Sequence, residues 1–135
     1  MRHSLRLVCP AGARLPHHPR EIRRLVERML QTLAPKSAEV ELVFGRDADI
    51  ADLNRRYLHR RGPTNCLAFP VARRADAFLG GSLFVSLDAL HRECLLYGQS
   101  PGAHLRRLLA HGLAHLAGLD HGEAMESLCA ALEKA

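Results

Sequence analysis

Residues 111–121 read His-Gly-Leu-Ala-His-Leu-Ala-Gly-Leu-Asp-His, a spacing typical of metal ligands on a helix and the turn that follows it. A helix advances about 100° per residue, so His111 and His115 leave the same face one turn apart. Gly118 tolerates left-handed backbone and is expected to end the helix, which lets the chain turn back and bring His121 to the pair. Apolar positions predict that this helix packs against a core; they are Leu108, Leu109, Leu113 and Leu116.

Three imidazoles form the ligand set expected for a catalytic metal ion. Three protein ligands leave one tetrahedral position open, as in catalytic zinc sites, and water at that position ionises near neutral pH. We therefore predict one Zn²⁺ per chain held by His111, His115 and His121, although Ni²⁺, Co²⁺ or Cu²⁺ would suit the same ligands. The alternative is that these are ordinary hydrogen-bonded histidines. The histidines without ligand spacing to one another are interpreted as ordinary polar residues: His17, His18, His59, His91 and His104.

The residue after the first histidine separates two kinds of hydrolase. Zinc peptidases with this spacing carry a glutamate there as general base, and this chain carries Gly112. Compared with the peptidase motif, this sequence has the histidine ligands but lacks the glutamate that acts as general base. Hydrolysis of a bond other than a peptide bond is the better interpretation.

Size and charge limit the class of protein. A chain of 135 residues with 47% hydrophobic content predicts one domain, residues 1–135, that buries its own core. The net charge is +5 and the sequence pI about 9.5, with arginine far more frequent than lysine. Arginine favours bidentate phosphate contacts, so a polyanionic partner is expected. The alternative is that the arginine content reflects only genome composition.

Neither a membrane span nor a secretory signal is expected. No run of 18 apolar residues occurs, and residues 1–10 lack a long apolar core. The predicted compartment is the cytoplasm, where cysteines stay reduced. The cysteines lie far apart and are expected to be free, buried thiols: Cys9, Cys66, Cys94 and Cys129.

Hydrophobic periodicity and the order of the elements predict an α+β fold with a four-stranded sheet packed by helices. We expect a single domain in which the sheet is mixed and the helix that bears the metal is zincin-like, as its histidine spacing indicates. The strands are expected at Ser4–Cys9, Ala38–Gly45, Asn65–Phe69 and Phe78–Ser86. The helices are expected at Arg20–Ala34, Asp47–Tyr57, Ser86–Tyr97, Pro101 onward through the histidines, and Glu123–Glu133.

Four segments together carry a family resemblance. They are Leu53–Tyr57, Pro63–Pro70 (Pro-Thr-Asn-Cys-Leu-Ala-Phe-Pro), Leu79–Val85, and the histidine segment followed by Glu123–Glu126. In this order they resemble the YbeY family of metal-dependent endoribonucleases, and the resemblance covers nearly the whole chain. It implies a single-strand-specific RNA hydrolase that acts in ribosomal RNA maturation and ribosome quality control. The implied partner is ribosomal RNA or the small ribosomal subunit, with no membrane.

The resemblance also assigns roles to single residues, and the position of Asp120 beside the third ligand suggests one more. His111, His115 and His121 match the family's metal ligands, and Thr64 and Asn65 match a strand beside the site that could align RNA. Turn and strand-entry chemistry is the alternative for Thr64 and Asn65. Asp120 is expected either to orient a ligand imidazole or to close the turn through backbone amides.

The sequence also departs from the family pattern. Leu58 stands where the family has an arginine that would stabilise charge on a phosphate. Arg60 or Arg61 could replace it, as could Arg55 or Arg56, and solvated surface charges are the alternative. Gly81 stands in place of an Asp, and Ala68 in place of a Ser.

These departures leave two further hypotheses beside a zinc-dependent endoribonuclease. One is a non-catalytic or weakly active ribosome-associated factor whose metal is structural, which Leu58 and Gly81 favour. The other is a zinc peptidase, which Gly112 disfavours.

Overall fold

The computed structural model of the protein describes residues 2–58, 65–71, 78–119 and 122–135. The strands in these residues are β1 (Arg2–Val8), β2 (Ser37–Gly45), β3 (Cys66–Pro70) and β4 (Phe78–Ser86). The helices are α1 (Pro19–Leu33), α2 (Asp47–Leu58), α3 (Leu87–Tyr97), α4 (Pro101–Leu116) and α5 (Glu123–Glu133). The bounds agree with those expected from the sequence to within two residues. For example, helix α1 begins at Pro19, one residue earlier than expected, and β1 ends at Val8, one residue earlier than expected.

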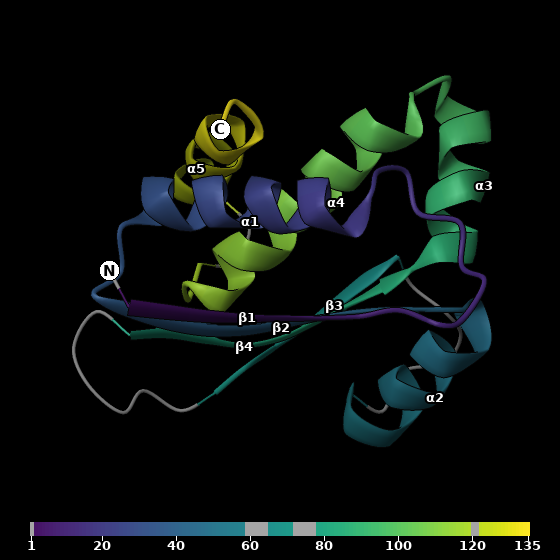
Figure 1. The fold of residues 1–135 in the computed structure, drawn as a ribbon, viewed down its shortest axis with the longest axis horizontal. Helices are drawn as coiled ribbons and strands as arrows, with labels where there is room; N and C mark the ends of the chain where they lie inside the picture. The colour runs from purple at the N-terminus through teal and green to yellow at the C-terminus, as the bar shows by residue number, and fades with distance from the viewer. Residues whose placement is uncertain (1, 59–64, 72–77, 120–121) are drawn as a thin grey trace.

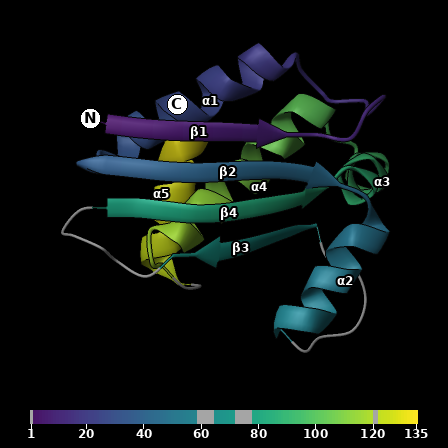
Figure 2. The ribbon, with the colours of Figure 1, turned by 60° about the horizontal axis from the view of Figure 1, so that its bottom comes forward.

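The strands form one mixed sheet in the order β1-β2-β4-β3 (Figure 2). Strands β1, β2 and β4 are parallel, and β3 runs antiparallel to β4. At the centre, Leu42 of β2 pairs with Leu7 on one side and Leu83 on the other. The prediction of an α+β fold with a four-stranded mixed sheet is confirmed.

The two faces of the sheet are covered unequally. Helices α1, α4 and α5 lie over one face, whereas α2 lies by the other face and α3 stands at one end of the sheet (Figure 1). Strand β2 alternates as expected, with Val40, Leu42 and Phe44 buried. These side chains join the apolar faces of α1 and α4 in the main core. Helix α4, which carries the predicted ligands His111 and His115, is therefore held between the sheet and two other helices.

Helix α1 shows how local sequence sets an element's ends. Its N-cap is His18, whose Nδ1 accepts a hydrogen bond from the Arg20 N–H at 3.1 Å, and Pro19 occupies the first turn, where no amide is needed. Ala34 ends the helix in the left-handed region at φ 51°. The buried residues recur at helical spacing and are Ile22, Leu25, Val26, Met29 and Leu30.

A polar network joins α2, β4 and α3 where β2 and β4 end. Asp47 accepts hydrogen bonds from the Ser86 hydroxyl at 2.8 Å and from the Arg92 guanidinium at 2.9 Å. The Ser86 hydroxyl in turn caps α3 by accepting from the Ala89 N–H at 3.1 Å. The hydrogen bond from Arg92 holds the pKa of Asp47 below its usual value, against the opposing effect of burial.

This network predicts a pH dependence of stability. Because the pKa of Asp47 is lower in the folded chain, its stabilising effect is complete above the unfolded value of about 3.9 and is lost as pH falls through the folded value. Urea unfolding measured from pH 6 to pH 2 should show an Asp47→Asn variant losing less stability over that range than the unsubstituted protein. Equal losses in the two proteins would contradict the assignment.

The cysteines are all free, as expected, but they are not all buried. Cys94 is buried in the main core, and Cys66 and Cys129 are half-buried. Cys9 is exposed, so the prediction of a buried thiol there is wrong. Its position explains the difference, because Cys9 lies beyond the last residue of β1 and is outside the alternating pattern that buries Leu5.

Candidate metal centre

Helix α4 places the first two predicted ligands at its buried C-terminal end. Ser100 caps its start by accepting from the Ala103 N–H at 3.3 Å, and Pro101 occupies the first turn. Its apolar residues fill the core as predicted, since Leu108, Leu109, Leu113 and Leu116 are all buried. His111 and His115 are half-buried on the remaining stripe.

The end of α4 is a glycine turn of the expected kind. Gly118 has φ 91°, in the left-handed region. Its N–H donates to the His115 carbonyl at 2.9 Å, and the Leu119 N–H donates to the Ala114 carbonyl at 3.1 Å. These two bonds form a Schellman motif, which closes the helix and reverses the chain directly after His115.

The two histidine rings converge on one point. Their Nε2 atoms lie 3.2 Å apart, which is hydrogen-bonding distance in the absence of a metal, and the rings meet edge to face with centroids 4.7 Å apart. The His115 Nδ1 lies 3.1 Å from the Leu119 carbonyl oxygen, which can only accept a hydrogen bond. That bond puts the proton on Nδ1 and leaves the Nε2 lone pair directed at the point shared with His111.

This geometry fits two ligands of one metal ion. Two imidazole nitrogens on a tetrahedral zinc, each at about 2.0–2.1 Å, lie about 3.3 Å apart. The observed 3.2 Å matches that separation, and the Leu119 carbonyl supplies the hydrogen bond that usually orients a ligand imidazole. The donor set therefore fits a metal that prefers nitrogen ligands.

Several predicted site residues lie outside the described residues. They are the third ligand His121, its neighbour Asp120, the candidate catalytic Arg60 and Arg61, and Thr64. Within the described ranges no group of three or more His, Cys, Asp and Glu side chains is placed to hold a metal. The roles of these five residues stay predictions.

Gly112 owes its identity to packing against the sheet. A Cβ at this position would lie 2.9 Å from Cδ2 of Leu83 and 3.3 Å from Sγ of Cys66. Position 112 thus faces the core beneath the helix, where burial raises the pKa of the Cys66 thiol to about 12. A peptidase glutamate does not fit here, which strengthens the argument against a zinc peptidase.

Gly81 is likewise a steric requirement of this chain, and its interpretation as the loss of a family carboxylate stays a prediction. Its φ is 145°, and an added Cβ would collide with the Phe69 carbonyl oxygen and lie 2.7 Å from Cδ2 of Leu116. Gly81 lets β3, β4 and the end of α4 approach closely. Ala68 is half-buried against the same core.

His104, interpreted from the sequence as an ordinary polar residue, has a structural role. It is only 5% exposed, and its Nε2 lies 2.7 Å from Oε1 of Glu93. Glu93 also accepts from Nδ2 of Asn65 at 3.2 Å. The signal was present in the sequence, because positions 104 and 111 are seven apart and share one helical stripe.

This network predicts a loss of stability when Glu93 is changed. A Glu93→Leu substitution removes the acceptor for both His104 and Asn65, and leaving the buried His104 donor unpaired costs about 1–3 kcal/mol. Chemical denaturation should show that loss, while a Glu123→Leu change at an exposed position should stay within about 0.5 kcal/mol of the original. A Glu93→Leu protein of unchanged stability would contradict the assignment.

Asn65 has a second interaction that fixes the start of β3. Its carbonyl accepts from the Ser86 N–H at 2.9 Å. Together with Glu93, this bond anchors β3 to β4 and α3. The role of Asn65 in RNA binding stays a prediction.

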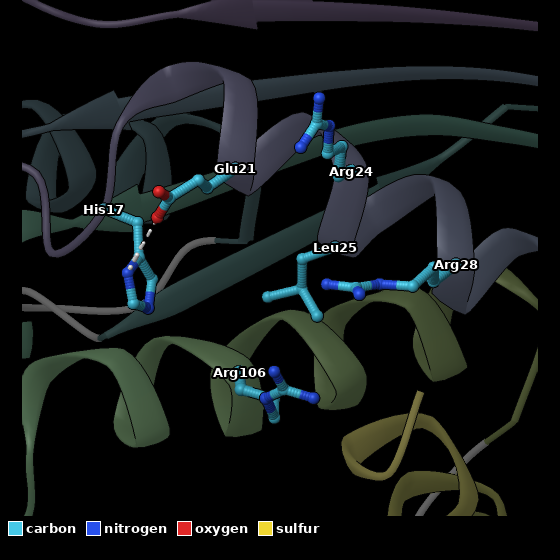
Figure 3. A pocket seen from close by; sticks show the side chains of 6 residues that line it. All are labelled: His17, Glu21, Arg24, Leu25, Arg28 and Arg106. Carbon is cyan, nitrogen blue, oxygen red and sulfur yellow. Dashed lines mark ion pairs between the residues drawn. The ribbon is translucent and has the colours of Figure 1, made fainter.

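Two clusters of basic side chains are defined in the part of the chain that the structure describes. Arg55 and Arg56 on α2 both pair with Asp52, at 2.8 Å and 3.3 Å. Another cluster lines a pocket of about 230 Å³ between α1 and α4, where Arg28 and Arg106 extend from the two facing helices (Figure 3). That pocket also contains Arg24 and the His17–Glu21 pair, and no metal-ligand candidate of α4.

The fold and the histidine pair define a class of small α+β domain with a candidate metal centre at the end of its central helix. The sequence profile described as "Endoribonuclease YbeY" matches residues 14–132. The chain belongs to the YbeY endoribonuclease family.

Individual relatives agree with this assignment. Endoribonuclease YbeY of Nitratidesulfovibrio vulgaris is 41% identical over an alignment 137 residues long, gaps included, that covers 88% of this chain and 85% of the relative. Endoribonuclease YbeY of Oleidesulfovibrio alaskensis is 40% identical over 129 residues, covering 80% and 76%. A solution structure of TM1509 from Thermotoga maritima has the same fold, with a TM-score of 0.69 at 18% identity over 97% of this chain and 87% of that one. Among the described helices, none combines the length and apolar character that crossing a membrane requires.

Proposed function

We propose that this chain is a zinc-dependent endoribonuclease that cleaves single-stranded RNA during ribosomal RNA maturation and ribosome quality control. Its partner would be ribosomal RNA or the small ribosomal subunit, and its place of action the cytoplasm. The supporting observation is the convergence of two Nε2 atoms 3.2 Å apart in a chain whose curated relatives are named endoribonucleases.

His111, His115 and His121 would hold one metal ion per chain. When bound, a divalent metal supplies Lewis acidity toward the phosphodiester and lowers the pKa of water at the site. The contribution of His115 is to direct its Nε2 lone pair at the site, because its Nδ1–H is engaged by the Leu119 carbonyl. Asp120 would orient a ligand imidazole in the same way.

Cationic and polar side chains would complete the reaction site. Arg60 or Arg61 would stabilise the negative charge that builds up on the phosphate, in place of the arginine that the family has at the position of Leu58. Thr64 and Asn65 would hold the strand beside β3. The anchoring of Asn65 by Glu93 supports a rigid start of β3 there.

The proposal is tested by offering the metal-loaded protein a single-stranded RNA and casein in parallel. RNA cleavage that disappears after chelation and returns with added Zn²⁺ is the expected result. Casein cleavage without RNA cleavage would overturn the proposal. RNA binding without cleavage by the metal-loaded protein would favour the ribosome-associated factor. A gain of cleavage in Leu58→Arg would then indicate a site handicapped by that residue.

A further inference from the structure

An aromatic groove lies on the side of the sheet opposite the histidine pair. Leu53, Tyr57, Phe69, Ser82 and Phe84 line a hollow of about 290 Å³ between α2 and the sheet. This volume is at the lower end of the roughly 300–1,000 Å³ of small-molecule sites. Neither His111 nor His115 lines this hollow.

The groove gathers aromatic rings in a chain that has few. The protein has four Phe, two Tyr and no Trp, yet three of these rings meet here. Phe69 stands edge to face with Tyr57 at 5.8 Å and with Phe84 at 5.6 Å between centroids. Tyr57 is nevertheless 62% exposed, so most of its ring is open to a ligand.

The groove adjoins the strand that also lies beside the metal-bearing helix. In β3, Phe69 points into the groove, whereas Cys66 lies against Gly112 of α4 on the other face. Strand β3 is at the end of the described sheet order, so only β4 is hydrogen-bonded to it there (Figure 2). A strand of RNA that crosses the β3 edge of the sheet would contact both faces of the sheet.

The charge beside the groove favours a polyanion. Arg55 and Arg56 immediately precede Tyr57 and share one carboxylate, Asp52. A second carboxylate, Glu41, accepts a hydrogen bond from the groove residue Ser82 and is paired with Arg6, so the balance of these groups is positive. Exposed aromatic rings flanked by arginine are the usual platform on which unpaired RNA bases stack. A protein partner would also cover an apolar groove, and the experiment below separates the two.

We propose that the aromatic groove binds one unpaired base of the RNA substrate by stacking on Tyr57, while the strand continues over the edge of β3 toward the histidines. This inference rests on the proposed function. It accounts for a preference for single strands, because a base paired in a duplex cannot enter the groove.

The chain offers a matched control for this test. Tyr97 on α3 is 65% exposed, close to the 62% of Tyr57, but it does not line the groove. Binding of a short single-stranded RNA to metal-stripped protein should weaken about tenfold in Tyr57→Ala, the usual effect of losing one base–aromatic stack. Tyr97→Ala should stay within about twofold, since it contacts no base. Tyr57→Phe should bind normally and Tyr57→Leu weakly, because only a ring can stack.

A second readout does not depend on loss of affinity. Since the chain has no Trp, Tyr57→Trp creates a single reporter, whose emission should fall when RNA binds, while that of Tyr97→Trp should not. An RNA with one abasic nucleotide at the bound position should bind more weakly to the unsubstituted protein, with no further loss on Tyr57→Ala.

Two results would overturn the inference alone, provided that the metal-loaded protein cleaves RNA. One is equal RNA affinity of Tyr57→Ala and Tyr97→Ala; the other is normal binding by Tyr57→Leu, which would indicate an apolar docking surface. A protein that neither binds nor cleaves RNA would overturn the proposed function together with this inference.

Discussion

Replacement of His115 by alanine is expected to reduce RNA cleavage by about 10³-fold or more. The side chain supplies one of two Nε2 atoms that converge at 3.2 Å, and its loss removes a ligand that the proposed metal centre cannot replace from α4. Metal activation contributes several kcal/mol to transition-state stabilisation, and about 1.4 kcal/mol corresponds to a factor of ten in rate. Cleavage of a fluorescent single-stranded RNA under single-turnover conditions measures the effect.

The matched control is His91→Ala, an exposed histidine on α3 that lines a different pocket. It should cleave RNA at a normal rate, and both variants should keep the circular dichroism of the original protein. A His115→Ala protein that is folded and retains more than a tenth of the activity would contradict a catalytic metal at this position.

The largest effect on stability is expected at Gly81. A Gly81→Ala change adds a Cβ against the Phe69 carbonyl and Leu116 at a φ of 145°, which side chains rarely adopt. Overpacking and backbone strain each cost about 1–3 kcal/mol, so the combined loss should be about 3 kcal/mol or more. Gly81→Asp should be worse still, because it also buries a charge. Urea unfolding curves measure both.

Gly118→Ala separates strain from steric conflict. Gly118 also has a positive φ, of 91°, but an added Cβ there meets nothing within 4 Å. The Gly118→Ala variant should lose only about 1–2 kcal/mol of stability, the usual cost of left-handed backbone for a residue with a side chain. If Gly81→Asp instead stabilised the chain or increased RNA cleavage, the structural account of Gly81 would be wrong.

The periodic parts of the fold could be predicted from the sequence. Alternation at Val40, Leu42 and Phe44 predicted β2, and the spacing of Ile22, Leu25 and Val26 predicted the buried face of α1. The ends of these elements were less certain, because capping depends on single residues such as His18, which is an unusual cap. The strand order could not be predicted, because it depends on long-range pairing such as Leu42 with Leu83.

The candidate site was predicted where helical spacing determines geometry. His111 and His115 converge because they are four residues apart, and Gly118 ends the helix because glycine accepts its backbone angles. Sequence patterns could not indicate that Gly81 and Gly112 are glycines for steric reasons, since their neighbours come from other elements. The pairing of His104 with Glu93 could not be predicted either, because Glu93 belongs to another helix. The position of His104 on the same helical stripe as His111 did indicate that its side chain faces the protein.

The metal content of the purified protein tests the central claim most directly. Elemental analysis should find about one equivalent of a divalent transition metal, zinc being the expected one, per chain of the unsubstituted protein. The His111→Ala/His115→Ala double variant, purified in the same way and shown to be folded, should contain almost none. An equal metal content in the two proteins, or full RNA cleavage by protein with no metal, would contradict the account.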